Sequence, residues 1–246
     1  MNSPWYVVAQ LGFVATSVIF IGLLFQYLRS ALKAAGYDSA MQRRIFGRTL
    51  MGTLLWVSIV SVLSISGFLQ DFSTFPPRMM IVLVVPLITI IGISTTKRLK
   101  HILSFIPPQR IIGLQVFRVF VELLLWLLFV IELLPVQMTF EGRNFDVLAG
   151  LTAPVVAYFC FVRKVWSKTV AVVWNFLSLA LLINIVTIAL LSIPSPFRHF
   201  MNEPANTIVA HFPIVWLPAI LVPLAYTLHI FSLIQLLGKR DGEGLT

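Results

Sequence analysis

The chain has 246 residues, of which 59% are hydrophobic and only 11% are charged. This balance excludes a soluble globular domain, because long apolar runs separated by short basic clusters are typical of helical membrane proteins. Each run stays apolar over about 20 residues instead of alternating with polar positions, which excludes a membrane β-barrel. The sequence therefore predicts an all-α membrane protein.

The net charge of +9 is explained by where the basic residues lie. Fourteen of the eighteen Lys and Arg fall in linkers that alternate along the chain with less basic ones. Cytoplasmic loops of membrane proteins carry such an excess of Lys and Arg. We therefore predict topology from this charge, with anionic lipid as a partner at the cytoplasmic loops and no nucleic acid.

Seven transmembrane helices are predicted in a single domain covering residues 1–246. The first is interpreted as a spanning helix and not a cleaved signal peptide, since no basic segment precedes it. The basic linker after it places the N-terminus outside, and seven crossings then place the C-terminal tail in the cytoplasm. The predicted helices cover residues 5–28, 49–69, 79–94, 111–134, 147–161, 169–191 and 214–237.

The fourth predicted helix carries charges in its interior. It reads RIIGLQVFRVFVELLLWLLFVIELL, with Arg118 and Glu122 one turn apart and Gln115 on the same face. A charge at the centre of a bilayer costs roughly 2.5–3.5 kcal/mol on insertion scales, so such residues usually face a protein interior or a cavity. We expect both side chains to be buried against other helices and to interact with each other.

Polar residues of other helices fall at a similar depth. At 1.5 Å per residue, Arg118 lies about 11 Å from the cytoplasmic end of its helix and Glu122 about 17 Å. His229 on the seventh helix lies about 12 Å from the same surface, and Asn175 on the sixth lies about 9 Å from it. Tyr158 on the fifth helix falls in the same layer. These residues form a candidate ligand site or proton path.

The second outer loop, PVQMTFEGRNFD, precedes the fifth helix. Asp146 stands where a helix N-cap is expected, and its carboxylate can accept from the first backbone N–H groups. Glu141, Arg143 and Asn144 are expected to order an outer rim with it.

Acids and histidines are also present on the predicted outer side, but residues of this kind in solvated loops seldom bind a metal. We expect no metal site and no cofactor. The outer acids and histidines are Asp71, Glu141, Asp146, Glu203, His199 and His211.

Two stretches, PPQRIIGLQVFRVFVELLLW and MTFEGRNFDVLAGLTAP, resemble a family of uncharacterised multi-span bacterial membrane proteins. The resemblance covers most of the chain and implies no activity. It implies that Arg118, Glu122 and the loop from Glu141 to Asp146 belong to one recurring design.

The leading functional hypothesis is an inner-membrane protein that binds or transports a small ligand or proton through a polar pocket. The alternative is a membrane-embedded enzyme, or an accessory or scaffold subunit in which the buried charges are purely structural. The sequence favours the absence of enzymatic activity without deciding it, and it assigns no catalytic residue. The lipid bilayer and an unknown small ligand are the expected partners, and an oligomer is left open.

Overall fold

The computed structural model describes residues 3–238, and the regular secondary structure of this part of the chain is entirely helical. The predicted C-terminal tail, residues 239–246, lies outside the described residues. The main helices are α1 (Pro4–Ala34), α2 (Ser39–Ile65), α3 (Met80–Ser94), α4 (Lys97–Ser104), α5 (Pro108–Gly113), α6 (Phe117–Val130), α7 (Val147–Ala157), α8 (Lys168–Leu191) and α9 (Val222–Leu237). Short 3₁₀ segments are η1 (Phe68–Gln70), η2 (Leu114–Val116), η3 (Val136–Met138) and η5 (Ile208–Ala210), and η4 (Tyr158–Val162) and η6 (Leu217–Leu221) are π-helical.

Each of the seven predicted apolar stretches is helical, but they differ in length. Five helices are long and apolar enough to cross a membrane, and the bent pair α3–α4 makes up to six. The fifth predicted helix, α7 with η4, belongs to the shorter apolar class. The five long helices are Pro4–Ala34, Ser39–Ile65, Pro108–Val130, Lys168–Leu191 and Leu217–Leu237.

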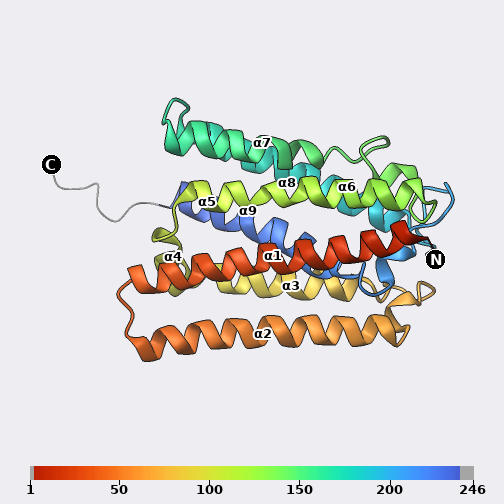
Figure 1. The fold of residues 1–246 in the computed structure, drawn as a ribbon, viewed down its shortest axis with the longest axis horizontal. Helices are drawn as coiled ribbons and strands as arrows, with labels where there is room; N and C mark the ends of the chain where they lie inside the picture. The colour runs from red at the N-terminus through yellow and green to blue at the C-terminus, as the bar shows by residue number, and fades with distance from the viewer. Residues whose placement is uncertain (1–2, 239–246) are drawn as a thin grey trace.

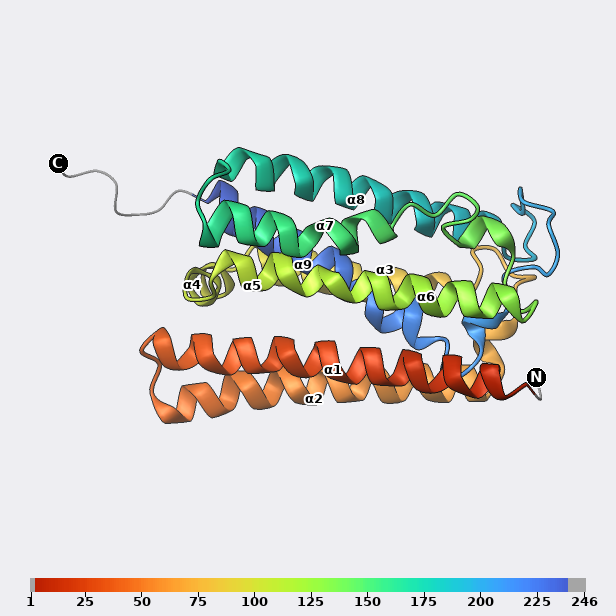
Figure 2. The same ribbon diagram turned by 45° about the horizontal axis from the view of Figure 1, so that its top comes forward.

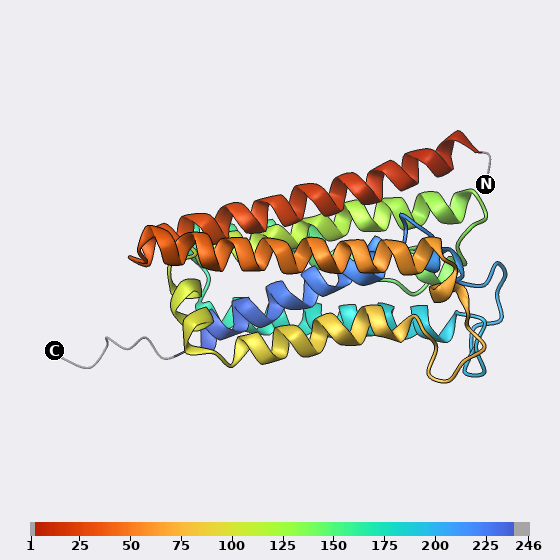
Figure 3. The same ribbon diagram turned by 90° about the horizontal axis from the view of Figure 1, so that it is seen from below.

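Apart from α4, the main helices lie side by side along the long axis of the molecule (Figure 1). The described N-terminus lies at the same end as the loops between α2 and α3 and between α8 and α9. The opposite end holds the α7–α8 turn (Figure 2) and the α1–α2 turn with α4 (Figure 3). We call this second end the basic end, because exposed Lys and Arg side chains gather there, among them Arg29, Lys33, Arg43, Arg44, Arg48, Lys97, Arg98, Lys100, Arg110, Arg163, Lys164 and Lys168.

The first two helices are longer than predicted. The expected linker of residues 29–48 is mostly helical, because α1 continues to Ala34 and α2 begins at Ser39. The tight turn between them contains Gly36 at φ 73°, a left-handed conformation that glycine adopts without steric cost. Asp38 then caps α2, since its carboxylate accepts from the backbone N–H of Met41 at 2.9 Å. The basic side chains of this linker therefore lie on helix ends.

The chain bends by 81° between α3 and α4. Thr96 caps α4, and its hydroxyl accepts from the backbone N–H of Leu99 at 3.3 Å. One face of α4 is buried through Ile102 and Leu103, whereas Lys97 is exposed. The residues predicted as an irregular loop thus form an amphipathic helix across the basic end of the bundle.

The segment 131–146 folds back into the bundle. α6 ends near the N-terminal end of the molecule, but α7 begins well inside it (Figures 1 and 2). The return is irregular apart from η3, and its side chains Met138, Thr139 and Asn144 are at most 2% exposed. Gly142 permits the close return, because a Cβ there would lie 2.7 Å from the Cα of Gln137. We call residues 131–146 the re-entrant segment.

Candidate functional site

Arg118 is the centre of a buried polar network, and only 2% of it is exposed. Its Nε donates to Oδ2 of Asp146 at 2.6 Å, and its Nη2 donates to Oδ1 of the same carboxylate. Nη2 also donates to the backbone carbonyl of Ser178 at 3.2 Å. Two parallel N–H···O bonds to one carboxylate are the strongest arrangement that a guanidinium makes in proteins.

His229 continues the network from α9. Its Nε2 lies 3.0 Å from Nη1 of Arg118, and its Nδ1 lies 2.9 Å from Oδ1 of Asn175. A guanidinium can only donate, so Nε2 must accept and the ring proton must be on Nδ1. Asn175 fits this assignment, because its Nδ2 donates to Ser232 at 3.0 Å and leaves its Oδ1 to accept. His229 is therefore held neutral in one tautomer, and the Trp174 ring packs against it at 5.6 Å.

Glu122 is 1% exposed and is bound differently from Arg118. Both of its oxygens lie 2.7 Å from Nδ2 of Asn144. The same Nδ2 also donates to the carbonyl of Met138 at 3.0 Å, so one N–H is left for the carboxyl group. Among residues 3–238, no Lys, Arg or His forms an ion pair with Glu122.

Both residues are buried as predicted, but within residues 3–238 the direct ion pair of Arg118 is with Asp146 and not with Glu122, which lies one turn away on the same helix. Arg118 pairs with Asp146, which the re-entrant segment brings into the bundle. The carboxyl group of Glu122 binds Asn144 from the same segment. The backbone N–H of Asp146 donates to Oδ1 of Asn144 at 3.0 Å and joins the two halves of the network.

The predicted outer rim is divided by the structure. Glu141 and Arg143 are exposed, and Glu141 accepts from Nε1 of Trp126 at 2.5 Å. Asn144 and Asp146 are buried in the network and do not belong to a rim. The expected side-chain cap is also wrong: Asp146 occupies the N-cap position of α7 but makes no capping bond, because Arg118 takes both of its oxygens.

The two other candidate residues have different positions. Gln115 is buried, and its side-chain amide Nε2 donates to the backbone carbonyl of Ala225 on α9 at 3.1 Å. Tyr158 is 45% exposed and lies outside the network, because its side chain is on the outward face of η4. The sequence did not place Ser178, Asn144 or Asp146 in the inner layer. The shortness of the predicted fifth helix was an indication that the chain before it, with Asn144 and Asp146, enters the bundle.

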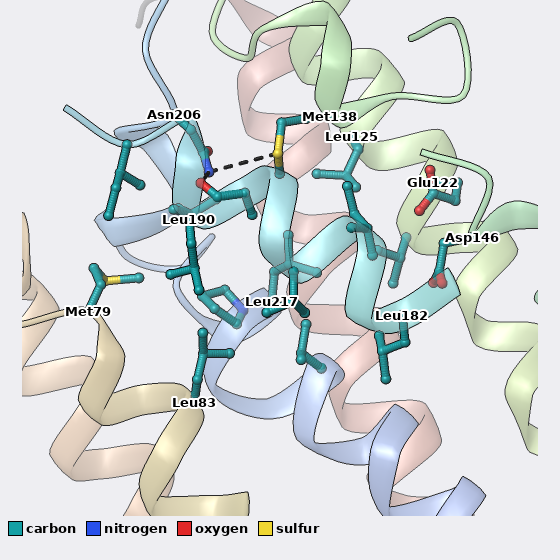
Figure 4. Close-up of a pocket in the computed structure, with 18 residues that line it drawn as sticks. Met79, Leu83, Glu122, Leu125, Met138, Asp146, Leu182, Leu190, Asn206 and Leu217 are labelled. Carbon is teal, nitrogen blue, oxygen red and sulfur yellow. Dashed lines mark hydrogen bonds between the residues drawn. The ribbon is translucent and has the colours of Figure 1, made fainter. Parts of the chain in front are cut away.

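A cavity of about 80 Å³ lies beside the network (Figure 4). Glu122 and Asp146 are on one side of it, and Asn206 and Met138 are on another. The rest of its wall is apolar and comes from α6, η5 and the η6–α9 helix, and from α3 and α8 with the residues next to their ends. These lining residues are Met79, Leu83, Val121, Leu125, Leu182, Ile185, Val186, Ala189, Leu190, Ile193, Val209, Leu217, Pro218 and Val222.

The outer acids and histidines do not converge. In the part of the chain that the structure describes, no group of three or more His, Cys, Asp or Glu side chains could hold a metal ion. Glu203 instead pairs with Arg198 at 2.9 Å, and Asp71 pairs with Arg78 at 2.8 Å.

Fold and site together define an all-helical protein with several helices long and apolar enough to span a membrane, which indicates a membrane protein. The chain belongs to the family described as Domain of unknown function (DUF8737), whose model matches residues 76–237. The matched region contains every residue of the buried network and both stretches that carried the resemblance. Searches of curated proteins and of solved structures found no match.

Proposed function

We propose that the chain is a seven-helix protein of the cell inner membrane, with its N-terminus outside, that binds or transports a small ligand or proton at the cavity beside Glu122. The segregation of exposed Lys and Arg at the basic end supports this orientation, since basic loops are retained in the cytoplasm. Anionic lipid is the proposed partner of that end.

The observation that carries the proposal is the carboxyl group of Glu122. It is buried at the wall of a cavity, and it receives one side-chain N–H but no cation. A buried carboxylate normally has an ionic partner, and removing that partner leaves a charge that is strongly unfavourable. Glu122 therefore requires a proton or a cation from the cavity, whereas Arg118 and Asp146 neutralise each other.

The scaffold alternative is supported by the other half of the network. Every side-chain group of Asn175, His229 and Arg118 that the network uses has a partner within the bundle. Fully bonded polar networks fix one arrangement of packed helices. We assign this half a structural role and place the exchange of ligand or proton at Glu122 alone.

Proton flux into sealed vesicles tests the proposal. The full chain is reconstituted in liposomes with an internal pH-sensitive dye, and a potassium gradient with valinomycin supplies the driving force. Wild-type protein should acidify the lumen faster than empty vesicles, and Glu122→Gln should remove the difference. Glu132→Gln is the matched control, because it makes the same chemical change at an exposed position at the end of α6.

Equal flux for wild type and Glu122→Gln would refute a proton path through this carboxyl group. Wild-type flux that equals empty vesicles would restrict the proposal to ligand binding, which the next experiment measures directly.

A further inference from the structure

The polar atoms that line the cavity have one property in common: their free hydrogen-bonding capacity is for accepting. Asn206 is fully buried, and its Nδ2 donates to the carbonyl of Ala189 at 3.1 Å. Since that carbonyl can only accept, the amide orientation is fixed and Oδ1 is the free atom. Within the described residues Oδ1 has no hydrogen-bond partner.

The other polar groups of the wall are acceptors as well. Glu122 presents a carboxyl group without an ion-pair partner, whereas the thioether sulfur of Met138 already accepts from Nδ2 of Asn206 at 3.9 Å (Figure 4). Asp146 also faces the cavity, but Arg118 occupies both of its oxygens. An occupant that donates hydrogen bonds would satisfy Glu122 and Asn206, whereas an anion would meet only acceptors.

The remaining wall sets the shape and polarity of the occupant. It consists of apolar side chains, most of them from α3, α6, α8 and the η6–α9 helix, so the body of the ligand is expected to be apolar. A volume of about 80 Å³ corresponds to roughly five to eight water-sized groups at about 10–15 Å³ each. This is the size of a short alkyl chain with one polar head.

We infer that the cavity is a binding site for a small organic cation, a primary alkylammonium, with its charged head on Glu122 and its apolar body among Leu182, Leu125 and Leu217. This inference rests on the proposed function and names its substrate class. The ammonium group supplies both the charge that Glu122 lacks and the donors that the wall lacks. Asn206 adds a second acceptor for a ligand whose far end also carries a donor.

Binding of three four-carbon probes that differ in their head group tests the inference. The full chain in detergent is titrated with n-butylammonium, with 1-butanol as the neutral analogue and with butyrate as the anionic one, and binding is followed by isothermal titration calorimetry. We expect the ammonium to bind and both analogues to bind at least about tenfold more weakly, since hydrogen bonds to charged groups contribute about 1.5–3 kcal/mol.

Two variants locate the site. Glu122→Gln should weaken n-butylammonium binding about tenfold or more, and Glu132→Gln should leave it unchanged. Leu182→Phe fills the cavity without changing charge and should also abolish binding. If either variant unfolds, Asn206→Leu takes its place. Wild-type protein should bind 1,4-diaminobutane more tightly than n-butylammonium, because Asn206 accepts from the second ammonium group, and Asn206→Leu should remove this difference.

The possible results separate the inference from the proposed function. If 1-butanol and n-butylammonium bind equally and Glu122→Gln changes neither affinity, the inference that the ligand is a cation is refuted, and the cavity remains a binding site for another kind of ligand. Preferred binding of butyrate would overturn it in favour of an anion held by Arg118. Absence of binding by all probes would overturn it as well, and the proton-flux experiment would then decide the proposed function alone.

Discussion

The buried ion pair can be assigned by a double-mutant cycle on Arg118, Asp146 and Glu122. Arg118→Leu leaves the Asp146 carboxylate, 7% exposed, without the two N–H groups that it accepts from. Loss of one member of a buried pair costs about 3–5 kcal/mol in the free energy of unfolding. Asp146→Leu should cost a similar amount, because it leaves an uncompensated guanidinium.

The double change Arg118→Leu with Asp146→Leu removes both charges together. It still leaves Nε2 of His229 and the carbonyl of Ser178 without a donor, at about 1–3 kcal/mol each. The double variant should therefore cost about 4 kcal/mol, which is about 4 kcal/mol less than the sum of the two single costs. The corresponding cycle with Glu122→Leu should give a smaller coupling energy, because Arg118 and Glu122 form no direct ion pair and interact only across a longer distance.

Reversible unfolding in mixed micelles of dodecyl maltoside and SDS, followed by tryptophan fluorescence, measures these free energies. A coupling energy for Arg118 and Glu122 as large as that for Arg118 and Asp146 would refute the assignment of the pair. Additive costs for Arg118 and Asp146 would show that the charges are compensated separately.

Three further predictions concern topology, packing and pH. After Cys160 is replaced by Ser, a cysteine at position 200 should react with an impermeant maleimide in intact cells and one at position 44 should not; the reverse pattern would reject an outside N-terminus. Gly150→Ala should destabilise the protein by about 1–3 kcal/mol, because its Cβ would lie 2.8 Å from the backbone N of Val119 on α6. Gly92→Ala is the control and should not destabilise the protein, because no atom lies within 4 Å of the added Cβ. Thermal unfolding in detergent compares the two variants. Burial lowers the pKa of His211 below 6.5, so the folded state is favoured while this side chain is neutral, above pH 6.5, and the contribution is lost as the pH falls through the lowered pKa. His211→Gln should therefore reduce the change in unfolding free energy between pH 8 and 5. An unchanged slope in this range would contradict the prediction.

The burial of Arg118, Glu122, Asn175 and His229 could be predicted from the sequence, because helix rise converts residue number into depth. The partners could not be predicted in the same way. They depend on the re-entrant segment, whose residues Asn144 and Asp146 are polar and follow a run typical of an exposed loop. Local pattern does not distinguish a polar loop in water from one that reaches a buried cation.

One signal was nevertheless present in the sequence. The predicted fifth helix of residues 147–161 is about 22 Å long at 1.5 Å per residue, which is short of the roughly 30 Å hydrocarbon core. Such a helix must either thin the bilayer or begin inside the protein. The structure has the second solution, and Asp146 therefore reaches Arg118 instead of the surface. Tyr158 shows a second limit of the sequence argument. Its depth follows from the helix rise, but depth alone does not determine which face of a helix points away from the bundle.

The re-entrant segment also has a consequence for biogenesis. In a bilayer, Arg118 enters the membrane during synthesis before its carboxylate partner, which follows 28 residues later. An unpaired arginine at that depth opposes insertion by about 2.5–3.5 kcal/mol. Insertion is therefore more favourable if the stretch from α5 to α7 leaves the translocon as one unit, with the Arg118 guanidinium and the Asp146 carboxylate already paired. A chain truncated before Asp146 would present Arg118 to the bilayer without this partner.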